Sequence, residues 1–200
     1  MKILVGIPTY DRRIDIEIVK TLFAIERMGK HHLDFLFPVS SHIARNRNYI
    51  CREAINGKYD TVLFWDSDIG IPNGNFLDMM LETAYKLDTK IVGGAYLMKK
   101  PNEKVYVSCE GLKDENPDNI RERAGEPRLV KAVGTGIMLI FREVLEKLDD
   151  PWFTIVDKKN LDVIPEDFYF CEKASEKGFT IGLDTRFETR HYGSSPWVHQ

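Results

Sequence analysis

Two acidic residues, Asp66 and Asp68, directly follow an apolar run and could hold a metal ion. The run, residues 61–65, is β-branched and aromatic, as expected for a strand buried on both faces of a parallel sheet. Side chains alternate along an extended chain, so both carboxylates should project to one side, with Ser67 opposite. Two carboxylates at one point repel each other unless a cation lies between them, and oxygen ligands suit Mg²⁺ or Mn²⁺.

An Asp-x-Asp sequence is common by itself, and its usual meaning is a solvated turn. Here Gly70 and Pro72 end a wholly apolar strand, and open α/β sheets bind ligands at the carboxyl ends of their strands. This context favours a metal site over a solvated turn.

A second pair of acids, Glu166 and Asp167, follows Pro165 at the expected start of a helix. The helix N-terminus favours the ionised forms of both acids, and capping alone would explain their presence. As an ionised carboxylate, Asp167 could instead act as a general base toward a hydroxyl group. The residues themselves leave both interpretations open.

Two further places could contribute to a site. His191 lies in a Gly- and Ser-rich tail, where a histidine is usually only solvated. Gly134, Thr135 and Gly136 separate two predicted strands, where they either let the backbone approach a ligand closely or form a bulge. All four places fall at the ends of elements rather than inside them.

The elements that must position these residues alternate in type through the first half of the chain. Apolar runs predict strands over residues 2–7, 33–37, 61–65 and 91–95, and three- and four-residue periodicity predicts helices between them. Ser40 or Ser41 is expected to cap the second helix, and Gly29 and Gly57 are expected to end the first two. The alternation predicts an α/β fold with a doubly wound, Rossmann-like, mostly parallel central sheet flanked by helices, a nucleotide-binding scaffold over residues 1–98.

After residue 98 the pattern changes to shorter elements. Strands are predicted over residues 104–109, 129–133, 136–141 and 179–183, with helices over 142–148 and 168–177. Residues 110–126 are polar and rich in turn formers, which suggests a lid. We expect residues 99–200 to form a smaller mixed or antiparallel half, folded onto one edge of the first half within a single domain of residues 1–200.

Composition limits the class of protein. With 200 residues, 43% of them hydrophobic, the chain is long enough for one sizeable core and short for two. A net charge of -3 gives no reason to expect nucleic acid or an anionic membrane as a partner. We expect neither a signal peptide nor an integral membrane segment, and therefore a soluble, cytoplasmic protein. Three scattered cysteines are expected as buried hydrophobes in a reducing compartment: Cys51, Cys109 and Cys171.

Taken together, these stretches resemble the nucleotide-sugar glycosyltransferases with the GT-A fold, most closely glycosyltransferase family 2. The matching segments follow one another in the family's order over nearly the whole chain. They are the first strand and nucleotide loop (5–12), the Ala-Arg-Asn helix start (44–48), the strand ending in Asp-x-Asp (64–68), the glycine loop (133–136), the Glu-Asp motif (165–167) and a C-terminal histidine. Any one of these motifs is weak, but their common order makes the resemblance strong.

The resemblance implies a metal-dependent hexosyltransferase that moves a sugar from a nucleotide-diphosphate donor to an acceptor hydroxyl, with inversion. A UDP-sugar is the favoured donor and a GDP-sugar a possible one, and the acceptor could be a glycan, lipid or protein. Asp167 is implied as the base, with Glu166 orienting sugar or acceptor. Asp68 and His191 are implied to bind Mn²⁺ or Mg²⁺, and Asp66 to face the ribose or the waters of the metal. The implied nucleotide-binding residues are Pro8, Thr9, Tyr10, Asp11, Arg45 and Asp66, and Gly134, Thr135 and Gly136 are implied as the donor/acceptor loop.

One segment departs from the family pattern. The family usually has an Asp-Asp-x-Ser run that contacts the base, whereas this chain has Phe-Pro-Val-Ser-Ser at residues 37–41, which leaves the base open. Two other classes also remain. One is a sugar nucleotidyltransferase, although residues 8–13 lack the glycines expected after its first strand. The other is a non-catalytic nucleotide- or sugar-binding module.

Overall fold

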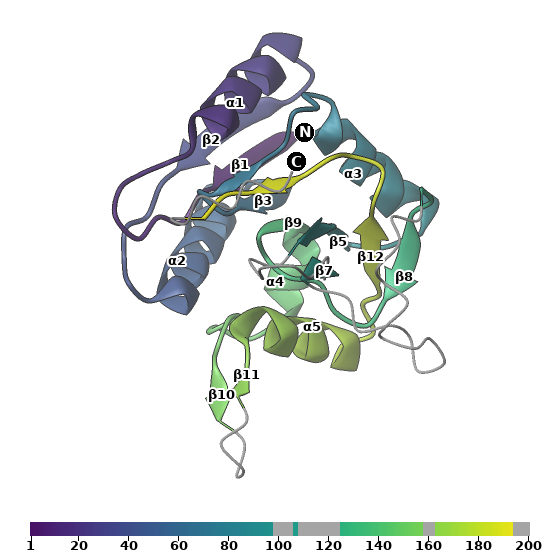
Figure 1. The fold of residues 1–200 in the computed structure, drawn as a ribbon. Helices are drawn as coiled ribbons and strands as arrows, with labels where there is room; N and C mark the ends of the chain where they lie inside the picture. The colour runs from purple at the N-terminus through teal and green to yellow at the C-terminus, as the bar shows by residue number, and fades with distance from the viewer. Residues whose placement is uncertain (98–105, 108–124, 158–162, 194–200) are drawn as a thin grey trace.

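A seven-stranded sheet forms the centre of the computed structural model, which describes residues 1–97, 106–107, 125–157 and 163–193 (Figure 1). The strand order is β2-β1-β3-β9-β5-β12-β8. Strands β9 and β8 run opposite to the others, so the sheet is mostly parallel. The strands are β1 (Lys2–Gly6), β2 (His32–Leu36), β3 (Thr61–Trp65), β5 (Ile91–Gly94), β8 (Arg128–Val130), β9 (Ile137–Phe141) and β12 (Ile181–Asp184).

Helices cover both faces of this sheet, and the alternation of side chains along β3 shows why both are needed. Val62 and Phe64 pack in one core with buried residues of α2, α4 and α5, whereas Leu63 and Trp65 pack in another with those of α1 and α3. Every residue of β3 is buried, which explains its uninterrupted apolar sequence. The helices are α1 (Ile16–Met28), α2 (Ile43–Asn56), α3 (Phe76–Lys86), α4 (Arg142–Lys147) and α5 (Glu166–Glu176).

The predicted elements that fall on described residues are confirmed in order and type, with small shifts at their ends. Gly29 ends α1 with a φ of 63°, a conformation that glycine adopts without strain, and Gly57 is the C-cap of α2. The predicted cap at Ser40 or Ser41 is wrong. His42 is the N-cap of α2, and the Ser40 hydroxyl accepts the His42 N–H in the turn that precedes the helix.

The prediction that residues 99–200 fold onto one edge of the first half is also wrong, because two of their strands lie inside the sheet. Strand β9 pairs with β3 on one side and β5 on the other, and β12 lies between β5 and β8. The first four residues of β9, Ile137–Ile140, are all fully buried. A strand of this kind needs cover on both faces, which the middle of the sheet provides.

Within the described ranges, three short two-stranded sheets accompany the central one. They pair β4 (Ile69–Gly70) with β13 (Arg190–His191), β6 (Tyr96–Leu97) with β7 (Tyr106–Val107), and β10 (Val156–Asp157) with β11 (Val163–Ile164). No helix in these ranges is both long enough and apolar enough to cross a bilayer. Cys51 and Cys171 are buried, as predicted. Cys109 and residues 110–124 of the predicted lid lie outside the described residues.

Candidate active site

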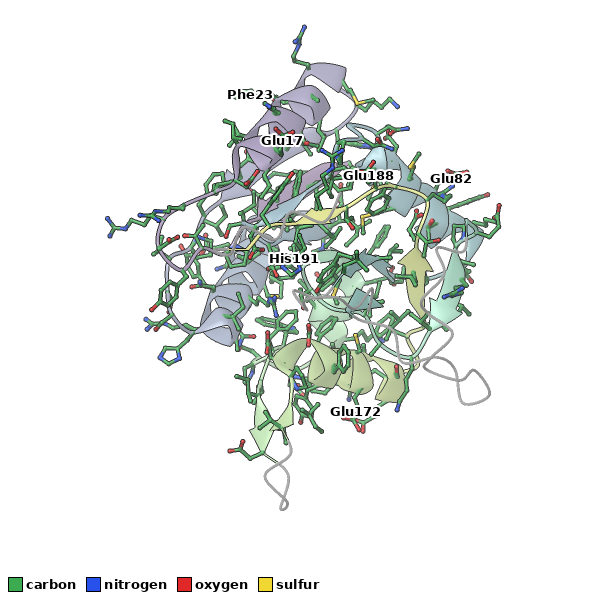
Figure 2. The ribbon with its side chains drawn as sticks, viewed as in Figure 1. Glu17, Phe23, Glu82, Glu172, Glu188 and His191 are labelled. Atoms are coloured by element: carbon green, nitrogen blue, oxygen red, sulfur yellow. The ribbon has the colours of Figure 1, made fainter. Side chains whose placement is uncertain are left out.

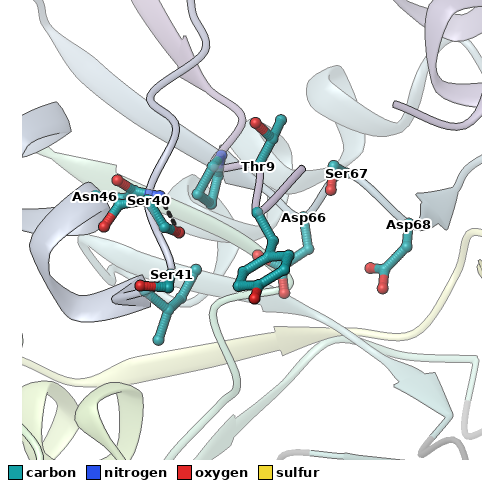
Figure 3. Close-up of a pocket in the computed structure, with 10 residues that line it drawn as sticks. Thr9, Ser40, Ser41, Asn46, Asp66, Ser67 and Asp68 are labelled. Carbon is teal, nitrogen blue, oxygen red and sulfur yellow. Dashed lines mark hydrogen bonds between the residues drawn. The ribbon is translucent and has the colours of Figure 1, made fainter. Parts of the chain in front are cut away.

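An open cavity of about 210 Å³ lies where β1 and β3 end. Figure 3 shows Asp66 and Asp68 beside it on the chain after β3, together with Thr9 from the chain after β1. The Thr9 hydroxyl is buried without a hydrogen-bond partner in the part of the chain that the structure describes, so a ligand could supply one. The other lining residues are Pro8, Tyr10, Ser40, Ser41, Ile43, Asn46 and Ser67.

Backbone pairing beyond the central sheet shapes one wall of this cavity. The Thr9 N–H donates to the Pro38 carbonyl, and the Ser40 N–H donates to the Thr9 carbonyl. These bonds extend the β1–β2 pairing and bring the segment that departs from the family pattern to the cavity. Its side chains there are hydroxyl groups, joined by the Asn46 carboxamide, so this wall is polar but uncharged.

The segment after β3 is a tight turn. The Ile69 N–H donates to the Asp66 carbonyl, and the Asp66 N–H donates to the Gly136 carbonyl at 2.8 Å. Residues 67–68 therefore form a turn and not the extended strand on which the predicted alternation was based, and Ser67 lines the same cavity as both carboxylates. The turn, rather than an extended strand, brings Asp66 and Asp68 to one space.

Strands β4 and β13 bring His191, which is labelled in Figure 2, to Asp68 from the far end of the sequence. The Tyr192 N–H donates to the Asp68 carbonyl, and the His191 Nε2 atom lies 3.6 Å from Asp68 Oδ1. The Nδ1 atom of the same ring lies 2.7 Å from the Leu97 carbonyl oxygen. Because a carbonyl can only accept, Nδ1 carries a proton, and in the tautomer that this selects the lone pair lies at Nε2.

This arrangement fits a divalent cation. Two ligands at about 2.1 Å from one ion lie about 3.0 to 4.2 Å apart, and the observed 3.6 Å falls within this range. The same 3.6 Å is too long for a hydrogen bond. The bond from Nδ1 to Leu97 is the kind of outer contact that orients a metal-binding histidine. Among the described residues, no group of three or more His, Cys, Asp or Glu side chains could hold a metal ion.

Arg47 of α2 joins two of the acids in the interior. Its guanidinium is ion-paired with Glu166 through Nη1, and Nη2 lies 3.4 Å from Asp66 Oδ1. The Arg47 side chain is only 5% exposed and that of Glu166 11%, so this pair is shielded from water. Desolvation raises the pKa of Asp66, and the nearby guanidinium acts against that rise.

Asp167 follows Glu166 in the first turn of α5 but is held by different groups. Its Oδ2 atom accepts the Thr135 N–H at 3.3 Å, and Oδ1 accepts the Phe168 N–H at 2.9 Å. Desolvation raises the pKa of Asp167, although Arg47 again acts in the opposite direction. At Asp167, desolvation therefore acts against the ionising effect predicted for the helix N-terminus.

The loop of residues 134–136 is hydrogen-bonded to both Asp66 and Asp167. The Gly136 N–H donates to the Tyr96 hydroxyl oxygen at 3.1 Å, while its carbonyl accepts the Asp66 N–H. A Cβ atom on Gly136 would lie 2.5 Å from Ile69 Cδ1 and 2.6 Å from Tyr96 Cζ. Close packing therefore requires glycine at position 136, because its backbone lies close to the side chains of Ile69 and Tyr96. Tyr96 in turn lies edge-on to the His191 ring, with centroids 5.6 Å apart.

The structure thus brings together most of the residues singled out in the sequence, and it leaves two of them elsewhere. Arg45 is exposed on α2 and does not line the cavity, and Asp11 contacts Arg13 instead. Sequence reasoning missed the chemical role of Arg47 and the contribution of Tyr96. A signal for Arg47 was present, because an arginine among apolar residues on the inner face of a helix indicates a buried ion pair.

Sequence comparison finds no matching family model and no matching curated protein. Structural comparison finds A197 from STIV, with a TM-score of 0.70 and 20% identity over 97% of this chain and 87% of that protein. It also finds GalNAc-T7 with UDP, GalNAc and Mn²⁺, with a TM-score of 0.59 and 13% identity. The mannosyltransferase PcManGT from Pyrobaculum calidifontis, in complex with GDP-Man and Mn²⁺, matches with a TM-score of 0.55 and 14% identity.

This chain has the GT-A fold. The alignments cover 99% and 92% of the chain, and they span 45% of GalNAc-T7 and 56% of PcManGT. The chain therefore spans about half the length of these two glycosyltransferases. At such low identity the likeness establishes the fold, and any activity must be argued from the residues of the site.

Proposed function

We propose that this protein is a metal-dependent glycosyltransferase that moves a sugar from a nucleotide-diphosphate donor to an acceptor hydroxyl. The observation that carries the proposal is the approach of His191 to Asp68, at 3.6 Å, beside a cavity lined by residues 8–10. The two glycosyltransferases of the same fold, one with UDP and Mn²⁺ and the other with GDP-Man and Mn²⁺, support it. Residues 1–98 would form the nucleotide-binding half and residues 99–200 the acceptor-side half of one cytoplasmic domain.

The donor would bind in the cavity after β1 and β3. Residues 8–10 would hold the nucleoside, and the buried Thr9 hydroxyl would find its missing partner there. Asp66 would face the ribose or the waters of the metal. Asp68 and His191 would hold Mn²⁺ or Mg²⁺. When bound, such a cation supplies positive charge against the negative charge that develops on the leaving diphosphate.

Asp167 would accept the proton of the acceptor hydroxyl. The acceptor oxygen would attack the anomeric carbon from the face opposite the leaving group, which would invert the configuration of that carbon. Two features support this role. Its carboxylate is held in place by the N–H groups of Thr135 and Phe168. Desolvation raises its pKa toward the working range of a base at neutral pH.

The test is hydrolysis of the donor without any acceptor, measured across UDP-, GDP- and dTDP-sugars with Mn²⁺, Mg²⁺ or EDTA. We expect slow, metal-dependent release of nucleoside diphosphate from one of these donors. Transfer would then be sought with glycan, lipid and protein acceptors. Tight, metal-dependent nucleotide binding with no hydrolysis or transfer would instead indicate a binding module, and would overturn the assignment as an enzyme.

Two variants separate donor binding from catalysis. Asp167→Asn should keep donor binding and lose turnover by about 10²- to 10⁴-fold, the usual contribution of a general base. Glu172→Gln is the matched control, because Glu172 is an exposed acid on the same helix (Figure 2). If Asp167→Asn transfers sugar at the rate of this control, the base is another residue.

A further inference from the structure

Arg47 holds a buried position between three elements of the site. From α2 it reaches Glu166 at the start of α5 and Asp66 at the end of β3. The Phe153 ring lies 6.0 Å from the centre of its guanidinium. Its Nε atom is buried and has no hydrogen-bond partner among the described residues. The two ion-pair contacts therefore set the orientation of the guanidinium.

The two neighbouring acids of α5, Glu166 and Asp167, differ in the groups that they contact. The carboxylate of Glu166 is committed to the buried ion pair with Arg47. The bonds that the described residues make to the Asp167 carboxylate come from the backbone N–H groups of Thr135 and Phe168. A proton can therefore be taken up on Asp167 without breaking an ion pair.

We propose that Arg47 is a positioning residue for sugar transfer, which fixes Glu166 through the buried ion pair and leaves Asp167 as the carboxylate that accepts the proton. Its second contact, to Asp66, ties this arrangement to the end of β3 that lines the donor cavity. The proposal rests on the proposed function, and it extends that function to a residue whose side chain reaches neither metal ligand.

Electrostatics gives this proposal a distinctive signature. The charged and titratable side chains that act on Asp167 include Arg47 from α2, Glu166 from its own helix and Tyr96 from β6. Besides desolvation, which raises the pKa of Asp167, the positive charge of Arg47 lowers it and the negative charge of Glu166 raises it. Removing the two charges one at a time should therefore move the titration of Asp167 in opposite directions.

The experiment follows the Asp167 carboxyl group by ¹³C NMR in the metal-free protein, alongside the pH dependence of turnover. Arg47→Met should move the titration and the acidic limb of the rate profile to higher pH by about one unit or more, because a close opposite charge typically shifts a carboxyl pKa by about 1 to 3 units. Glu166→Gln should move the titration of Asp167 to lower pH, because glutamine keeps the shape of the side chain and removes its negative charge. Arg52→Lys, an exposed substitution on α2, is the control that should move neither.

Each result decides the proposal. Arg47→Met leaves buried carboxylates without their cation and could unfold the protein; in that case Glu166→Gln carries the test alone. If Asp167 titrates in Glu166→Gln as it does in the wild type, the division of roles is wrong. If the titrations shift as expected but no donor is ever turned over, the contacts of Arg47 are supported as an electrostatic arrangement and the proposed function fails.

Discussion

Replacing Gly136 by alanine tests whether the loop of residues 134–136 is tightly packed between Asp66 and Asp167. The new Cβ atom would lie 2.5 Å from Ile69 Cδ1, 2.6 Å from Tyr96 Cζ and 2.8 Å from the Tyr96 hydroxyl oxygen. Ile69 is 0% exposed and Tyr96 is 4% exposed, so neither side chain has room to retreat. The ring of Tyr96 must therefore shift, and it would weaken the bond that its oxygen accepts from the Gly136 N–H.

Overpacking of this kind costs about 1 to 3 kcal/mol in free energy of unfolding. In a chain of this size, 1 kcal/mol shifts the melting temperature by about 2 to 4 °C, so we expect Gly136→Ala to melt about 2 to 12 °C below the wild type. Gly125→Ala is the matched control, because a Cβ atom there meets nothing within 4 Å. The measurement is thermal unfolding followed by circular dichroism at one pH and salt concentration. A melting temperature for Gly136→Ala equal to that of Gly125→Ala would refute the packing argument.

Three further predictions concern the metal site, the core and an ion pair. Asp68→Asn should weaken Mn²⁺-dependent UDP binding, measured by calorimetry, by at least about tenfold, which is the low end of the loss caused by removing an outer contact of a metal ligand. The control Asp149→Asn changes an exposed acid and should leave the affinity unchanged. Equal affinities of the two variants would remove Asp68 from the site. Phe153→Ala should lower the free energy of unfolding, measured by urea denaturation, by about 3 to 5 kcal/mol, because the Phe153 ring is 1% exposed and stacks on Phe170 with ring centroids 4.7 Å apart. A loss below about 1 kcal/mol would contradict that packing. Desolvation acts to raise the pKa of Asp78, but hydrogen bonds from Lys30 and His31 outweigh it and lower the pKa. The stabilisation that Asp78 contributes is therefore present above the ordinary pKa of aspartate and is lost as pH falls through the lowered value. Asp78→Asn should flatten the decrease in stability below about pH 4, and an unchanged pH profile would contradict this.

The elements of the fold were predictable because the sequence patterns follow directly from burial. Strand β3 is buried on both faces and reads as an apolar run, and α1 shows the periodicity of a helix with one buried side. The sheet order was not predictable in the same way. Strand β9 is as apolar as β3, and nothing local in such a strand specifies which neighbours it pairs with. Its place between β3 and β5 depends on contacts between distant segments.

The site was predictable to the extent that its residues stand at element ends in a known order. The residues alone indicate a solvated tail for His191, and only the resemblance connects it with Asp68. Physically, the pairing of β13 with β4 makes this connection, through strands of two residues each that carry too little pattern to be recognised. Arg47 was recognisable as an inner-face residue, but its partners come from two other elements, so no spacing rule could name them.

The loop of residues 134–136 contacts both parts of the site. This loop accepts the Asp66 N–H through Gly136, and it donates to the Asp167 carboxylate through Thr135. The approach of Asp68 and His191 depends instead on the pairing of β4 with β13 and on the Leu97 carbonyl. The methyl group of alanine at position 136 would also press on Ile69 of β4, which pairs with His191, and on the Tyr96 ring, which lies edge-on to His191. In the Gly136→Ala protein, turnover and Mn²⁺-dependent UDP affinity should therefore both fall, and an affinity equal to that of Gly125→Ala would mean that the pairing of β4 with β13 holds the metal ligands independently of the loop.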